Sequence, residues 1–323
     1  MAALANPKTA AGVRVVPPFS IRFRAWWEGM DPADLMAPQS APVAAAPAKK
    51  PAVSGKVPEL AWNTPRVKML QTLWGPGFSQ PGGAEFSLWL ANPCTLDPSL
   101  TVIELGAGLG GTSRTIEREL GCWVAGYERD PEIATAGMGL STLAGLGRRV
   151  PIERYDPEDL DLKPGGYDCI LSREAIFSIK NRKGFFDQVG RALKVGAHLA
   201  YIDIVKIPRE GEPQPTYRAW VKGERHHCEP WSLTEHRQAC AERALDLRVA
   251  DDITAAVRGQ VLQAMADLLQ KADELKTAEP LGKATLDAEI GRWTRRIAAI
   301  NAGDIGICRI HAIKVSAKTM SNW

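Results

Sequence analysis

A glycine-rich turn is the part of the sequence best suited to hold a ligand. Residues 102–111 read VIELGAGLGG, so Gly106, Gly108 and Gly110 follow a short apolar run and precede a helix expected to begin near Thr112. Such a turn needs backbone freedom, and a ligand approaches the main chain most closely where no Cβ intervenes. Gly106, Gly108 and Gly111 also match G-x-G-x-x-G, so the glycines alone do not separate a dinucleotide from another nucleoside ligand.

Three carboxylates at successive strand ends favour S-adenosylmethionine as the ligand. Glu104 precedes the first glycine and can lie near a cationic amino acid, whereas a dinucleotide pyrophosphate gains nothing from a negative charge there. Glu128 closes the next strand and can accept both ribose hydroxyls, and Asp156, after Tyr155, can accept from an adenine amino group. In full, the predicted cofactor-binding residues are Glu104, Gly106, Gly108, Gly110, Glu128, Arg129, Tyr155, Asp156 and Ser172.

Each carboxylate also has a purely structural explanation. Glu104 could be a salt-bridged core residue, Glu128 a charge at a helix N-terminus, and Asp156 a turn residue before Pro157. Their order within one strand–helix–strand pattern is what favours the ligand, because the carboxyl ends of parallel strands line one crevice.

The elements that must position these residues alternate between β-rich and helical runs, which indicates an α/β fold with a Rossmann-like parallel sheet covered on both faces. From Trp231 to about Asn301 the chain is expected to be mostly helical, with apolar residues at helical spacing over 253–276, as an insertion before the last strand. The expected strands are 101–105, 122–128, 150–154, 167–172, 198–205 and 306–315. The expected helices between them are 109–120, 131–144 and 182–194.

The first 60 residues differ from the rest, since they hold 9 of the 23 prolines. Residues 37–57 are rich in Ala, Pro and Lys without apolar periodicity, which predicts a linker. Within 1–36, the aromatic segment 15–36 is expected to dock on its own chain, a sister subunit or a protein partner. The remaining 58–323 form the predicted catalytic domain, with a helical lid or decoration over about 206–303.

The composition narrows the class of protein. Forty basic and 37 acidic side chains give a net charge of +3, too small for a nucleic-acid stripe, so we expect no nucleic acid, and the charge leaves both a small-molecule substrate and a protein partner open. Six cysteines lie far apart without a C-x-x-C pair, which favours reduced thiols and a cytoplasmic location. We expect no membrane span, because no stretch approaches the ~18 apolar residues required.

The glycine turn ELGAGLGG resembles the first motif of class I S-adenosylmethionine-dependent methyltransferases. Three further segments resemble phosphoethanolamine N-methyltransferases and related small-amine methyltransferases. They are LWGPGFSQPGG (73–83), similar to G-E-x-(F/Y)-x-S-x-G-G; YDCILSREAI (167–176), similar to Y-D-x-I-x-S-R-D-x-I; and WTRRI (293–297), similar to W-S-R-K-I. The likeness spans roughly 60–315 and implies methyl transfer, at nitrogen by family resemblance.

The resemblance also implies substrate and catalytic residues, with departures. The family's histidine after the fourth strand, and the tyrosine that pairs with it, correspond here to Ser178 and Trp62, and a tyrosine after Asp203 is replaced by Ile204. A phosphate-facing lysine of the family corresponds to Arg296. The catalytic candidates are Glu174, whose alternative is an ion pair with Arg173, and Ser178; the substrate candidates are Trp62, Gln80, Arg173, Asp203 and Arg296.

Two alternatives remain at this point. The run His226-His227-Cys228-Glu229, with His236 downstream, offers metal ligands, but adjacent ligands rarely close a tetrahedral site, so we expect a lid or surface loop and no metal. The lost histidine–tyrosine pair also allows a catalytically inactive, cofactor-binding scaffold that recruits a partner through its N-terminal segment.

Overall fold

A computed structural model describes residues 62–270 and 283–316. The chain divides into two units, Met1–Val57 and Pro58–Trp323, and all described residues belong to the second. The predicted docking segment (1–36) and linker (37–57) therefore lie outside the described residues.

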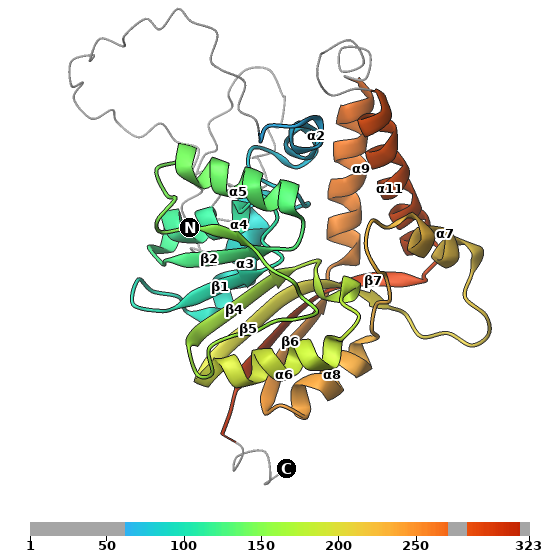
Figure 1. Cartoon of the computed structure of the whole chain (residues 1–323). Coiled ribbons are helices and arrows are strands. Elements are labelled where there is room, and N and C mark those ends of the chain that lie inside the picture. The colour runs from blue at the N-terminus through green and yellow to red at the C-terminus, as the bar shows by residue number, and fades with distance from the viewer. Residues whose placement is uncertain (1–61, 271–282, 317–323) are drawn as a thin grey trace, which may run out of the picture. The chain divides into compact units, whose positions relative to one another are not determined.

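A seven-stranded sheet forms the centre of the fold, with strand order β3-β2-β1-β4-β5-β7-β6 (Figure 1). The first five strands pair in parallel, as predicted, while β7 runs antiparallel between β5 and β6. The strands are β1 (Val102–Leu105), β2 (Val124–Glu128), β3 (Ile152–Arg154), β4 (Tyr167–Arg173), β5 (Leu193–Lys206), β6 (Leu245–Asp252) and β7 (Ile305–Lys314). The sheet confirms the predicted Rossmann-like class.

Helices cover both faces of this sheet (Figure 1). The α4 and α5 helices lie on one face, and α6 and α8 lie on the other. At one end of the sheet, α2, α9, α11 and α7 pack together. The helices are α2 (Pro65–Trp74), α3 (Gly83–Ala91), η2 (Asn92–Cys94), α4 (Gly111–Leu120), α5 (Pro131–Leu143), η3 (Ile176–Ser178), α6 (Arg182–Ala192), α7 (Pro215–Gly223), α8 (Leu233–Ala241), α9 (Thr254–Gln270) and α11 (Lys283–Asn301).

The central strands read as nearly continuous apolar runs because each of their faces is buried in a separate core. On β5, Leu199 and Tyr201 pack with α6, whereas Ala200 and Ile202 face the core shared with α2 and α9. Alternate residues of a strand point to opposite faces, so both sets must be apolar when both faces are covered. None of the described helices combines the length and hydropathy needed to cross a membrane.

The expectation of a mostly helical stretch from Trp231 to Asn301 was wrong at residues 245–252. This segment, LDLRVADD, is the edge strand β6, paired antiparallel with β7. Leu245, Leu247 and Val249 alternate with polar residues, as in a strand with one buried face. Because an edge strand also carries charged residues on its open side, this alternating pattern is short and was missed in the sequence. Helices do follow it before the last strand, as predicted, in α9 and α11.

Candidate active site

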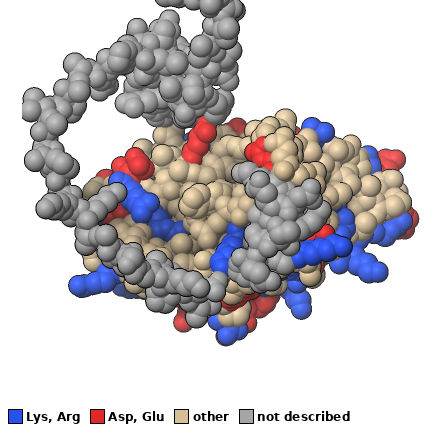
Figure 2. Space-filling view, turned by 90° about the horizontal axis from the view of Figure 1, so that it is seen from above, with Lys and Arg blue, Asp and Glu red and all other residues tan. Residues whose placement is uncertain are grey.

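A cleft lies at the carboxyl ends of β1, β2 and β4. Its near wall comes from these strand ends and the glycine turn, and its far wall comes from α11 and the loop after α7. Basic and acidic side chains are interspersed on the visible described surface in Figure 2. The cleft is therefore positioned as ligand crevices of open α/β sheets are.

The glycine turn fits its surroundings only because it lacks side chains. Gly106 and Gly108 have φ angles of 79° and 56°, in the left-handed region that favours glycine. A Cβ on Gly108 would lie 2.1 Å from the Ser79 hydroxyl oxygen, and one on Gly106 would lie 2.4 Å from the Cβ of Ala175. Because the two glycines lack side chains, Ser79 and Ala175, which follows β4, can pack directly against the turn.

Glu128 ends β2 at the floor of the cleft and holds the turn in place. Its Oε2 accepts from the Gly108 amide at 2.8 Å, and its Oε1 accepts from the Asp130 amide at 2.9 Å. Burial raises the pKa of this carboxyl, although the two amide hydrogen bonds act against that. Each carboxylate oxygen keeps a second lone pair, so the group can still accept from a ligand hydroxyl.

The 73–83 segment lies across the turn and is held by two buried arginines. Arg114 donates to the Gly77 carbonyl at 3.0 Å, and Arg173 donates to the Pro81 carbonyl and to Thr112. Gln80 in turn donates to the Arg173 carbonyl at 2.8 Å. Arg173 and Gln80, predicted to touch substrate, both line the cleft, and both also position this segment.

Arg296 of α11 anchors the far wall through two carboxylates. Its Nη1 donates to Glu174 at 2.8 Å, and its Nε and Nη2 bind both oxygens of Glu224 at 2.5 and 3.0 Å. Burial alone would lower the pKa of Arg296, but the two carboxylates outweigh it and raise the pKa above its ordinary value. Glu174, the catalytic candidate, lines the cleft, and its ion-pair partner is Arg296 in place of the alternative partner Arg173. An anion that reaches Arg296 must displace a carboxylate.

A second group of charged side chains on the same wall has the opposite ratio of positive to negative charges. Glu289 accepts from Arg225 at 2.8 Å and from Arg292 at 2.9 Å, and its side chain is 1% exposed. Burial opposes its ionisation, yet the two arginines hold the pKa of Glu289 below its ordinary value. Two guanidiniums share one carboxylate here, while at Arg296 two carboxylates share one guanidinium.

Two histidines from the loop after α7 line the cleft, although the sequence suggested only a metal or lid role for them. Burial, reinforced by the charge of Arg129, lowers the pKa of His226, which favours the neutral imidazole. His227 Nε2 lies 3.2 Å from Glu229 Oε2. The loop therefore forms part of the cleft wall, and its action as a lid stays a prediction.

Ser178, at the position of the family histidine, holds another side chain. It lies in η3, donates to the Ala175 carbonyl at 2.7 Å and accepts from Arg129 Nη1 at 2.9 Å. Both Ser178 and Arg129 line the cleft. Ser178 therefore orients Arg129 and has no basic group of its own.

Several predicted residues do not line the cleft. Asp156 accepts from the Glu158 amide at 2.9 Å within its own turn and borders an adjoining hollow, which it shares with Tyr155, a residue of the cleft wall. Glu104 is buried beneath the turn and accepts from Ser113 at 2.6 Å. The others are Gly110 at the start of α4, Ser172 and Asp203 buried within β4 and β5, and Trp62 packed on Gly139 of α5.

The sequence did not identify Glu224, Arg225, Glu289 and Arg292 as cleft residues. Arg292 and Glu289 precede Arg296 by one and two helical turns, so helical spacing back from the WTRRI motif was the available signal. Glu224 and Arg225 follow α7 in a stretch with little family likeness, and no local pattern marks them.

Comparisons with known proteins identify the family and the fold of this chain. A family described as "Methyltransferase domain" matches residues 80–248, which is slightly more than half of the chain. Phosphoethanolamine N-methyltransferase 3 of Arabidopsis thaliana is 22% identical over 234 residues, covering 72% of this chain and 46% of that protein. The chain thus spans about half the length of this curated relative.

Solved structures share the fold. Phosphoethanolamine N-methyltransferase 2 of Haemonchus contortus, in complex with S-adenosyl-L-methionine, gives a TM-score of 0.67 at 18% identity, covering 77% of this chain and 57% of that one. Geranyl diphosphate C-methyltransferase of Streptomyces coelicolor A3(2), in complex with Mg²⁺, geranyl diphosphate and S-adenosyl-L-homocysteine, gives a TM-score of 0.58 at 18% identity, covering 71% and 78%. The family resemblance predicted from the sequence is confirmed.

Proposed function

Because the chain belongs to this methyltransferase domain family, we propose that it transfers a methyl group from S-adenosylmethionine to a small-molecule acceptor. The observation that carries the proposal is the glycine turn clamped by Glu128 at the carboxyl edge of the sheet. By name, the relatives above are an N-methyltransferase of phosphoethanolamine and a C-methyltransferase of geranyl diphosphate, and the sequence likeness to the amine methyltransferases favours nitrogen as the acceptor atom.

The residues of the cleft fit the proposed cofactor. Gly106 and Gly108 present main chain without Cβ atoms, as a nucleoside approaching the turn requires. Glu128 offers free lone pairs to ribose hydroxyls, and Tyr155 offers an apolar ring face on the same side of the cleft. The cofactor supplies a methyl group on a positively charged sulfur, and the protein's part is to align the acceptor and exclude water.

The far wall supports a small zwitterionic acceptor. The group of Arg225, Arg292 and Glu289 carries a formal excess of one positive charge, and the group of Arg296, Glu174 and Glu224 an excess of one negative charge. An acceptor with an anionic end and an amine end would place its negative charge near the excess positive charge and its amine near the excess negative charge. A purely anionic acceptor would have to compete with Glu289 for its arginines.

An amine must lose a proton before it can attack the methyl group. His226 lines the cleft with a lowered pKa, so its neutral imidazole can accept that proton near neutral pH. We expect His226→Gln to lower the turnover rate while leaving the affinity for S-adenosylhomocysteine unchanged. Equal turnover rates in the variant and the parent protein would remove His226 from this role.

Calorimetry with S-adenosylhomocysteine tests the cofactor site. We expect micromolar binding by the full chain and a loss of at least about 100-fold, or about 2.7 kcal/mol, in Glu128→Ala. The matched control is Glu153→Ala, which removes an exposed carboxylate of the neighbouring strand β3 and should bind normally. Equal affinities in both variants would contradict the site.

A panel of probe molecules tests the acceptor class. Phosphoethanolamine carries both charges, whereas ethanolamine and ethyl phosphate each carry one, so in the presence of S-adenosylhomocysteine we expect the zwitterion to bind at least about tenfold more tightly than either fragment. Mass spectrometry of a metabolite extract incubated with the protein and labelled S-adenosylmethionine then identifies the natural acceptor. Equal binding of the three probes would remove the zwitterion proposal and leave methyl transfer standing.

Two finer assignments remain proposals. All six cysteines are free and buried, which supports a reducing compartment such as the cytoplasm. The segment 15–36 is proposed to dock on its own chain or a partner, and it lies outside the described residues. The relatives named above are methyltransferases by name and give no support to a non-catalytic scaffold.

A further inference from the structure

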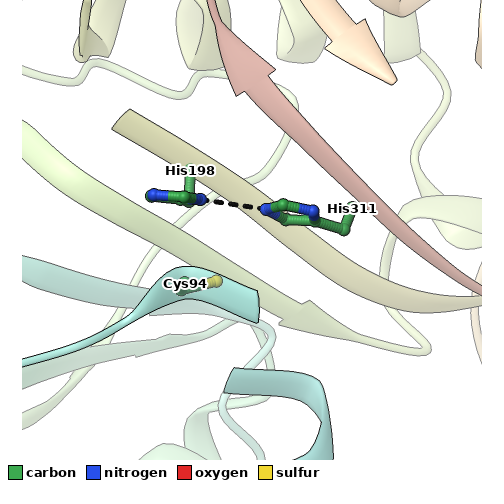
Figure 3. A group of neighbouring side chains, drawn as sticks. All are labelled: Cys94, His198 and His311. Carbon is green, nitrogen blue, oxygen red and sulfur yellow. Dashed lines mark hydrogen bonds between the residues drawn. The ribbon is translucent and has the colours of Figure 1, made fainter. Parts of the chain in front are cut away.

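Three soft donor atoms meet on one face of the sheet, away from the cleft. They belong to Cys94 at the end of η2, His198 on β5 and His311 on β7, and all lie within 4.8 Å of one another (Figure 3). The cleft is built at the carboxyl ends of the strands, whereas His198 stands eight residues before the end of β5. Nothing in the methyl-transfer chemistry uses this group, which we call the Cys/His cluster.

The two imidazoles already point their nitrogens at each other. His198 Nδ1 lies 2.9 Å from His311 Nε2, and the ring planes differ by only 14°, so one ring donates to the other (Figure 3). Burial lowers the pKa of both histidines, and neighbouring Arg309 and Arg248 lower that of His311 further. Neutral imidazoles are the form that binds a metal ion.

A second thiol lies next to the cluster. Cys169 on β4 stands opposite His198 in the sheet register, and its wholly buried thiol interacts with the thiol of Cys94. The pKa of Cys169 is raised well above its ordinary value, first by burial and then by Cys94. A fourth donor of suitable chemistry therefore lies beside Cys94 and His198, on a fourth element of the fold.

We propose that Cys94, Cys169, His198 and His311 form a structural Zn²⁺ site. Tetrahedral zinc with Zn–N near 2.0 Å and Zn–S near 2.3 Å places nitrogens about 3.3 Å apart and a nitrogen and sulfur about 3.6 Å apart. The two imidazole nitrogens lie 2.9 Å apart and the Cys94 sulfur lies within 4.8 Å of both, so these three donors need to move by on the order of 1 Å to reach that geometry. Cys169 would supply the fourth ligand from the neighbouring strand. The ion would replace the imidazole–imidazole hydrogen bond and release the two thiol protons to solvent, and the two thiolates would neutralise its charge.

Such a site would tie η2 to three strands of the sheet. The η2 turn follows α3, and α3 packs against α4 directly behind the glycine turn, so a metal here stabilises the support of the cleft without touching a ligand. The donors are separated by up to 217 residues in the chain, which is why no spacing in the sequence indicates the site.

Cobalt(II) titration of the full chain, purified in the presence of a chelator and reductant, tests the proposal. We expect one equivalent to bind with a thiolate-to-cobalt charge-transfer band and the visible bands of tetrahedral cobalt, and zinc to bleach both. Cys94→Ser and, separately, the half-buried His198→Gln should weaken these bands, while Cys240→Ser, which removes a buried thiol on the opposite face, should keep them. His198→Gln keeps the test valid if a core cysteine variant fails to fold.

Two results would overturn the site. One is a folded parent protein that shows no thiolate-to-cobalt band and no rise in melting temperature with zinc. The other is an unchanged spectrum in Cys94→Ser or His198→Gln, which places the bound metal elsewhere. S-adenosylhomocysteine affinity should be the same for the metal-free and zinc-loaded chains to within about twofold, because no cluster residue lines the cleft.

Discussion

The cleft and the Cys/His cluster are both buried polar regions, but they are stabilised in opposite ways. In the cleft, charged side chains are matched with opposite charges, as Arg296 is by Glu174 and Glu224. In the cluster, His198 and His311 stay neutral and satisfy each other with one hydrogen bond. A ligand therefore enters the cleft by exchanging ionic partners, whereas a metal enters the cluster by displacing protons.

The largest effect should come from removing the central charge of the far wall. Arg296→Met leaves the two carboxylates of Glu174 and Glu224 buried without their common partner, so we expect the free energy of unfolding to fall by about 3–5 kcal/mol. Urea denaturation measures it. Arg248→Met is the matched control, because Arg248 pairs with Asp246 at the surface and its loss should cost less than about 1 kcal/mol. Similar losses in the two variants would show that the far-wall charges are screened by water.

The glycine turn should give the next largest effect, on binding. Gly108→Val forces a branched side chain into a left-handed conformation and against Ser79, so we expect S-adenosylhomocysteine affinity to fall by at least about 100-fold, or about 2.7 kcal/mol. Gly145→Val suffers the same backbone strain at φ 72°, with no atom within 4 Å of the added Cβ. If Gly145→Val binds normally and Gly108→Val does not, the loss of affinity comes from the altered cleft and not from backbone strain alone. Equal binding would refute the assignment of the turn.

The same contrast explains how far the sequence could be interpreted. The turn, Glu128 and the near wall were predictable because a strand, a glycine run and a helix are contiguous in the chain. Glu224, Glu289 and the Cys/His cluster were not, because their partners are brought together only by tertiary packing. Glu104 shows the intermediate case, since its spacing indicated a ligand contact but its side chain turns into the core to bind Ser113.

Glu104 should make the support of the cleft less stable as the pH rises. Burial raises its folded-state pKa from 4.5 to about 7, against hydrogen bonds from Ser113 and the charge of Arg173. The folded state therefore holds a proton that the unfolded state loses, and this stabilisation, full below pH 4.5, disappears as the pH rises to about 7. At pH 7.5 we expect Glu104→Gln to be more stable than the parent protein by about 1–3 kcal/mol. Melting curves at pH 5 and 7.5 measure it, and a constant difference between the two proteins would contradict the raised pKa.

His311 of the Cys/His cluster should make the protein less stable as the pH falls, which is opposite to the effect of Glu104, and this change in stability should be the smallest of those predicted. Burial and the charges of His198, Arg309 and Arg248 lower the folded-state pKa of His311 from 6.5 to about 4, so the unfolded chain takes up a proton first. Stability present above pH 6.5 is then lost as the pH falls to 4, and His311→Gln should recover about 1 kcal/mol of that loss in the metal-free chain. Burial also lowers the pKa of His236 to about 4, so this residue causes a similar loss of stability at low pH in both the parent protein and His311→Gln. With zinc bound the parent protein should lose stability more steeply over the same range, since protonation then also releases the metal, and the variant should show no such steepening.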